Sequence, residues 1–133
     1  MLKRKLAMLL AVTVVMGITI PALAVNLNFP ITPSPTYSYV ASGTGWLSGS
    51  GRSHIFTTTL YGGRRYKITL SGPWSADFDL YLYDSNGNRV ASSTGNSTGE
   101  TVYISPSWTG RFYIKVVSYR GSGSFTIRLY KRS

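Results

Sequence analysis

The chain has no cysteine, one histidine and only four acidic residues among its 133 residues. Without cysteine it has neither a disulfide framework nor a thiolate that could act as nucleophile or metal ligand. The single histidine, His54, cannot supply the three or four ligands of a typical zinc site. Nothing around His54 indicates a Ser-His-Asp arrangement, so we predict a protein that is not an enzyme.

Negative charge is equally scarce, and the net charge is +10. The fourteen lysines and arginines, less the three at positions 3–5, leave 11 basic against 4 acidic residues, a net charge of +7 for the remaining chain. These 11 residues are spread over most of the sequence, so we predict no nucleic-acid partner. We interpret the charge as favouring solubility and attraction to anionic cell walls, polysaccharides or acidic proteins.

The longest apolar run lies at the N-terminus. Basic residues at positions 3–5 precede an apolar stretch of 15 residues over 6–20, Pro21 breaks it, and residues 22–24 read Ala-Leu-Ala. This order is typical of a secretory signal peptide, and the stretch is shorter than the roughly 20 residues of a membrane-spanning helix. We predict a signal peptide over residues 1–24, a secreted extracellular protein and no membrane association after cleavage. A retained membrane anchor is the alternative.

Three prolines fall within residues 25–42, at positions 30, 33 and 35. Proline at this density favours an extended, semi-rigid chain. We interpret the segment as a linker or leading arm. Because apolar residues alternate at positions 27, 29 and 31, an edge strand packed onto the domain is the alternative.

Residues 43–133 show the period-two alternation of β-strands and no helical period. Glycine, serine and asparagine interrupt the pattern about every 8–12 residues, as in all-β sandwiches. We therefore predict an all-β domain over residues 43–133, an antiparallel β-sandwich of about eight strands. The residues expected to point inward are Trp46, Ile55, Phe56, Leu60, Tyr66, Ile68, Leu70, Phe78, Leu80, Leu82, Val102, Ile104, Phe112, Ile114, Val116, Phe125, Ile127 and Leu129.

Three of the four acidic residues lie in one segment, WSADFDLYLYDSNGN, at residues 74–88. Asp77 and Asp79 leave the same face of the expected strand, side by side and not across a cleft as in a glycosidase pair. Calcium takes several oxygen ligands, and Asp77, Asp79 and Glu100 are the candidates for a calcium site. The alternative for Asp77 and Asp79 is that they pair with arginines or accept hydrogen bonds from nearby backbone amides. No other cofactor is predicted.

The calcium loop of an EF-hand is absent from this segment. Arg89 occupies the position where that loop needs glycine, and Gly95 the position of its final glutamate. Asn86-Gly87 instead favours the type I′ turn of a β-hairpin.

Tyrosine is abundant, with ten residues in the chain. Tyr81 and Tyr83 share the face of the two aspartates, which we expect to point outward, and with Tyr113 they are the candidate ligand-binding residues. The alternative is that tyrosine is simply common in strands. A carbohydrate-binding module would instead need the three tryptophans, Trp46, Trp74 and Trp108, exposed in one line.

The segment YGGRRYKITLSGPWSADFDLYLYDSNGNRVASS, followed by GETVYIS, GRFYIKVVSY and GSGSFTIRLY, resembles the bacterial pre-peptidase C-terminal domain. The matching positions run from about residue 45 to residue 130 and are Gly63, Tyr66, Ile68, Leu70, Asp77 to Tyr83, Glu100, Gly110, Phe112, Tyr113, Ile114 and Val116.

This resemblance implies a jelly-roll-like β-sandwich of the kind appended to secreted peptidases, where it is non-catalytic and assists secretion, stability or substrate attachment. Related domains of bacterial collagenases bind collagen and calcium. Their calcium site depends partly on acids in the preceding linker, and residues 25–50 of this chain contain none.

The function predicted from the sequence is therefore a secreted, non-catalytic module that binds an extracellular protein or a cell-surface polymer. A self-assembling structural or surface protein and a carbohydrate-binding module are the two alternatives. The sequence predicts no oligomeric state.

Overall fold

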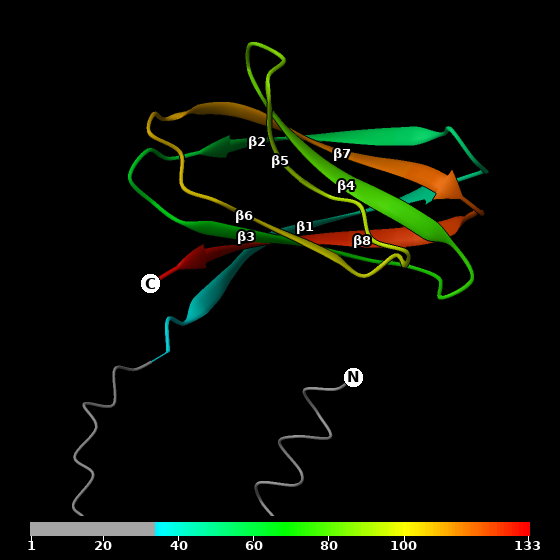
Figure 1. Ribbon diagram of the computed structural model, residues 1–133. Helices are drawn as coiled ribbons and strands as arrows, with labels where there is room; N and C mark the ends of the chain where they lie inside the picture. Colours follow the sequence, from blue (N-terminus) through cyan, green and yellow to red (C-terminus); the bar gives the residue numbers. More distant parts are fainter. Residues whose placement is uncertain (1–33) are drawn as a thin grey trace, which may run out of the picture. The chain divides into compact units, whose positions relative to one another are not determined.

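The computed structural model describes residues 34–133, which fold into eight β-strands (Figure 1). The expected signal peptide and the first half of the proline-rich segment, residues 25–33, lie outside the described residues. None of the described residues forms a helix long and apolar enough to cross a membrane. The strands are β1 (Tyr37–Leu47), β2 (Ser53–Leu60), β3 (Tyr66–Ser71), β4 (Asp77–Asp84), β5 (Arg89–Ser93), β6 (Glu100–Ile104), β7 (Gly110–Arg120) and β8 (Gly123–Arg132).

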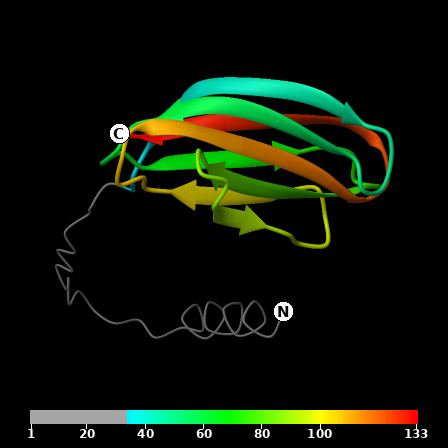
Figure 2. The ribbon, with the colours of Figure 1, turned by 90° about the horizontal axis from the view of Figure 1, so that it is seen from above.

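The strands form two four-stranded antiparallel sheets packed face to face, which Figure 1 shows one above the other and Figure 2 shows from above. Sheet A has the order β1-β8-β3-β6, and sheet B the order β2-β7-β4-β5. The predicted all-β sandwich of eight strands is confirmed. The loops β1–β2, β3–β4, β5–β6 and β7–β8 lie at one end of the sandwich, which we call the β3–β4 end.

The alternating residues of β4 place its apolar side chains in the core. Phe78, Leu80 and Leu82 are fully buried between the sheets, and the ring of Phe78 packs edge-on against Phe125 of β8. Most of the predicted core residues are buried with them or partly buried against them.

Two predicted core residues are not in the core. Ile55 is 55% exposed, because Phe56 faces inward and successive side chains of a strand leave opposite faces. Trp46 is 65% exposed for the same reason, since Leu47 takes the buried position.

The inner face of β1 is lined by glycine where aromatic rings approach it. A Cβ atom on Gly43 would lie 2.5 Å from the ring of Phe56, and one on Gly45 would lie 2.6 Å from the ring of Phe125. These positions need glycine because any larger residue would displace a core ring. β1 itself begins at Tyr37, so residues 37–42, expected in the arm, are part of sheet A.

Candidate functional site

Asp77, Asp79 and Glu100 come together although they belong to different sheets. Asp77 and Asp79 lie on β4 of sheet B, whereas Glu100 begins β6 of sheet A. One carboxylate oxygen from each residue lies within 4.8 Å of the others. All three side chains are buried, with 6%, 7% and 4% of their surface exposed. We call these three residues the acidic cluster.

Asp77 and Asp79 were expected on an exposed outer face, but both are buried. Residues 94–96 of the β5–β6 loop lie beside the two aspartates, and Thr98 anchors the loop. The Thr98 hydroxyl donates to the backbone oxygens of Ala76, at 2.7 Å, and Pro73, at 3.1 Å. The acidic cluster is therefore covered in part by the loop that lies between Asp79 and Glu100 in the chain.

The hydrogen bonds of the acidic cluster are unevenly distributed. Glu100 accepts hydrogen bonds from the Ser93 hydroxyl and from the backbone N–H of Gly95, the latter at 2.6 Å. The Oδ1 atom of Asp77 is buried and has no hydrogen-bond partner among the described residues. A buried carboxylate oxygen without a donor is costly, so this atom is available to a ligand.

The electrostatics of the cluster follow from its burial and its like charges. Burial, then the negative charges of Asp77 and Glu100, raise the pKa of Asp79 above its usual value of 3.8. Burial and the Asp79 charge also raise the pKa of Tyr81, which Arg89 partly offsets. The site thus favours a proton or a cation over three bare carboxylates.

Asp79 should make the stability of the metal-free protein depend on pH. Its folded-state pKa lies above the unfolded value, so its stabilising contribution is complete below about pH 3.8 and is lost as the pH rises through the folded-state pKa. Urea titrations in chelator, between about pH 4 and pH 7, should show the wild type losing free energy of unfolding relative to Asp79→Asn. A difference between the two proteins that does not change with pH would contradict this.

The remaining acid, Asp84, lies at the other end of β4 and shapes the hairpin. It accepts hydrogen bonds from the backbone N–H groups of Asn86 and Asn88, both at 2.9 Å, and from the Asn88 side-chain amide. Burial raises its pKa, but these hydrogen bonds outweigh burial and the net pKa is lowered. The Gly87 N–H donates to the Asp84 carbonyl at 3.1 Å, the Asp84 N–H donates to the Asn88 carbonyl at 2.9 Å, and Gly87 has a φ of 81°. The hairpin is therefore closed by the three-residue loop Ser85-Asn86-Gly87 with glycine in the left-handed position, and the predicted two-residue type I′ turn is wrong. Asp84 is therefore a turn residue and not part of the acidic cluster.

The candidate ligand-binding tyrosines lie together on the outer face of sheet B. Tyr83 on β4 pairs directly with Tyr113 on β7, and the Tyr81 ring stacks on Tyr83 with centroids 6.4 Å apart. All three are partly exposed. We call them the sheet B tyrosines.

A polar pocket lies between the acidic cluster and the sheet B tyrosines. Asp77 and Asp79 of the cluster line it, and so does Tyr81. The sequence did not predict its other members, because they lie on loops or strand ends without a recognisable motif. The pocket is lined by Asp77, Asp79, Tyr81, Arg89, Ser92, Thr94, Gly95, Asn96 and Tyr119.

The tryptophans do not form a line. Trp46 and Trp74 lie at the β3–β4 end, whereas Trp108 lies in the β6–β7 loop at the opposite end and stacks on Phe112. All three are exposed, but on separate parts of the domain. The arrangement expected of a tryptophan-based carbohydrate-binding module is absent from residues 34–133.

Two features could suggest catalysis, the serine of the β5–β6 loop and the single histidine. Residues 95–99, Gly-Asn-Ser-Thr-Gly, have the spacing of a nucleophile elbow, but an elbow joins a strand to a helix and this loop joins β5 to β6. His54 packs against the rings of Phe56, at 4.5 Å, and Phe125, at 5.9 Å. The imidazole thus has an aromatic environment.

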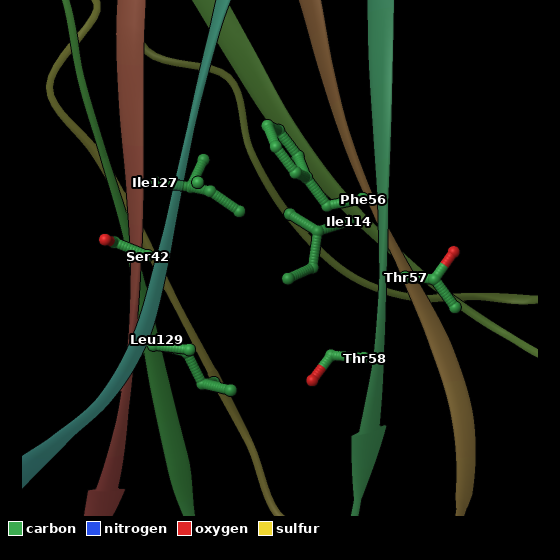
Figure 3. A pocket seen from close by; sticks show the side chains of 9 residues that line it. Ser42, Phe56, Thr57, Thr58, Ile114, Ile127 and Leu129 are labelled. Atoms are coloured by element: carbon green, nitrogen blue, oxygen red, sulfur yellow. The ribbon is translucent and has the colours of Figure 1, made fainter.

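A second pocket lies between β1 and β2 and is mainly apolar. Figure 3 shows Ile114, Ile127, Leu129 and Phe56 pointing into it. None of its lining residues is titratable. It is an opening onto the core between two edge strands.

Comparison with known protein families matches residues 52–118 to the bacterial pre-peptidase C-terminal domain. This match includes β4 and the acidic cluster. The chain belongs to this family. Pre-peptidase C-terminal domains are non-catalytic accessory modules of bacterial extracellular peptidases, and the resemblance expected from the sequence is confirmed.

Solved structures share the fold of this pre-peptidase C-terminal domain. The pre-peptidase C-terminal domain of collagenase from Bacillus anthracis has 17% identity and a TM-score of 0.56, covering 67% of this chain and 87% of that one. PliG from Aeromonas hydrophila, a periplasmic inhibitor of g-type lysozyme, has 8% identity and a TM-score of 0.57, covering 71% and 87%. At these identities the likeness concerns the fold alone.

Proposed function

We propose that this pre-peptidase C-terminal domain acts outside the cell as a calcium-binding attachment module. In this proposal the acidic cluster holds one calcium ion, and the sheet B tyrosines contact an extracellular protein or surface polymer. The pattern of residues 1–24 supports secretion.

The observation that carries the proposal is the buried acidic cluster with its unpartnered Asp77 oxygen. Calcium ligands lie about 2.3–2.6 Å from the ion, so oxygens on opposite sides of one ion can be about 5 Å apart. The cluster oxygens, within 4.8 Å of one another, fit that spacing. An ion there would neutralise the carboxylates and supply the partner that the buried Oδ1 of Asp77 lacks.

Attachment through the neighbouring tyrosines is supported by their geometry. The Tyr81 ring stacks on Tyr83, and the guanidinium carbon of Arg89 lies 6.0 Å from the Tyr81 centroid. Rigid, partly exposed aromatic side chains contribute much of the energy of protein contacts. A bound ion would fix the wall of the pocket beside Tyr81.

Co-sedimentation with insoluble protein and with purified bacterial cell wall tests the attachment. We expect the protein to sediment with at least one of them in calcium, and the double variant Tyr83→Ala, Tyr113→Ala to bind about tenfold more weakly, since two interface aromatics are lost. Thr59→Ala, exposed on the same face and paired with Arg111, not with a tyrosine, is the control and should bind normally. Equal binding by the tyrosine variant and this control would contradict the proposal.

A further inference from the structure

The charged side chains that this domain exposes have one sign. All four carboxylate side chains of the chain, Asp77, Asp79, Asp84 and Glu100, are buried, with between 4% and 7% of their surface exposed. The exposed cationic side chains on residues 34–133 therefore have no exposed acidic side chain beside them. Such a surface attracts polyanions over its whole extent, and a specific site needs an additional feature.

That feature is a row of aromatic residues across the outer face of sheet A. The β1 register shifts between Tyr39 and Ala41, and the bulge places Tyr39 beside Tyr130 on the outer face, with ring centroids 6.2 Å apart. Tyr130 pairs with Lys67 of β3, and Lys67 pairs with Tyr103 of β6. One row therefore crosses all four strands of the sheet.

Tyr37 of β1 completes the row, because its ring lies 6.0 Å from that of Tyr103. We call Tyr37, Tyr39, Tyr103 and Tyr130 the tyrosine strip. Tyr39 is 60% exposed and Tyr103 is 51% exposed.

Two cations are held by the tyrosine strip. The Lys67 ammonium lies 4.9 Å from the Tyr37 centroid and 4.6 Å from that of Tyr130. The Arg65 guanidinium carbon lies 5.9 Å from the Tyr103 centroid. A carboxylate partner would fix a cation and cancel its charge, whereas a neutral ring fixes it and leaves the charge available. Both cations are therefore positioned in advance for an anion.

The adjacent row on the same face adds hydrogen-bonding groups. Arg128 of β8 pairs with Thr69 of β3, which pairs with Thr101 of β6, and both Arg128 and Thr101 are exposed. Side chains two residues apart on a strand share a face, so these three flank the tyrosine strip. The face thus combines aromatic rings, hydroxyl groups and uncompensated cations.

We propose that the tyrosine strip, with Lys67, Arg65 and Arg128, is a binding site for an acidic polysaccharide that carries carboxylate groups. Carboxylates would meet the fixed cations, and sugar hydroxyls would meet the threonine and tyrosine hydroxyls. A single-stranded nucleic acid fits less well, because base stacking needs free ring faces. Lys67 covers faces of Tyr37 and Tyr130, and Arg65 covers a face of Tyr103. This site is separate from the sheet B tyrosines and the acidic cluster.

Binding of short alginate chains, measured in chelator at physiological salt, tests this inference. We expect Lys67→Gln to weaken binding about tenfold, the loss that corresponds to one charge-assisted contact. We expect about the same loss for Tyr103→Ala, because Arg65 is then no longer held in place. Lys115→Gln makes the same charge change on the outer face of sheet B and should weaken binding less than about twofold. Lys67→Arg keeps the charge and should keep most of the affinity. Neutral dextran should not bind.

Three results would overturn the site. Equal losses for Lys67→Gln and Lys115→Gln would mean diffuse attraction by the whole surface. Tighter binding of oligo(dT) than of alginate of equal charge would make the partner a nucleic acid. Dextran binding as tight as that of alginate would remove the role of the cations. Because the assay is run without calcium, its outcome is independent of the acidic cluster, and Asp79→Asn should bind alginate like the wild type.

Discussion

Calcium at a hundred times its dissociation constant is expected to raise the free energy of unfolding by about 2.7 kcal/mol, because the ion binds only the folded protein. For a domain of this size that corresponds to a rise in melting temperature of about 10 to 20 °C. The acidic cluster is assembled from two sheets, so the unfolded chain has no comparable site. Thermal melts at saturating calcium and in chelator measure the difference directly.

Two aspartate variants separate ion binding from general stability. Asp79→Asn should abolish the calcium increment while leaving the metal-free protein as stable as the wild type or more so, since it relieves the repulsion that raises the Asp79 pKa. Asp84→Asn makes the same charge change outside the cluster. It should lower the melting temperature both in calcium and in chelator, because it weakens the turn. The difference between the two melting temperatures should stay the same. Coincident wild-type melts with and without calcium would rule against the site.

Truncation of the central core ring should be the most destabilising single change. Phe78→Ala is expected to lower the free energy of unfolding by about 3–5 kcal/mol, because it removes a fully buried ring and leaves a cavity beside Phe125. Domains of this kind have a total stability of about 5–15 kcal/mol, so the variant should be unfolded in part at moderate temperature. Urea denaturation measures the loss of free energy of unfolding and the slope of that free energy against urea concentration.

Trp74→Ala is the matched control for this change. It removes a larger aromatic side chain that is 95% exposed, so no cavity forms. The expected change is within about 0.5 kcal/mol. A loss as large as that of Phe78→Ala would mean that aromatic content, and not burial, sets the stability.

The fold could be predicted well because alternation in a strand directly reports which side chains face the core. In β4 the pattern of Phe78, Leu80 and Leu82 placed the core face correctly, and Asn86-Gly87 located the hairpin but not its turn type. The pattern gave the wrong result where two apolar residues are consecutive, as at Ile55-Phe56. Only one of two neighbours can face inward, and the choice depends on pairing with β7.

The candidate site could be predicted in its residues but not in its burial. Alternation puts Asp77 and Asp79 on the face opposite the core, and a lone sheet would expose them there. Their enclosure depends on the β5–β6 loop, which Thr98 fastens through hydrogen bonds to residues more than twenty positions away. Likewise, the tyrosine strip depends on a bulge in β1 that no residue type at Val40 signals.

The burial of every acidic side chain also affects how copies of this domain behave toward each other. Two surfaces of the same sign repel at low ionic strength, and the repulsion is screened over about 10 Å at 0.1 M salt. The domain should therefore stay dispersed in dilute buffer and crowd together only where salt or a polyanion neutralises it. A polyanion that binds many copies would neutralise the charge of all of them. The domain would then accumulate along the polymer and cover it.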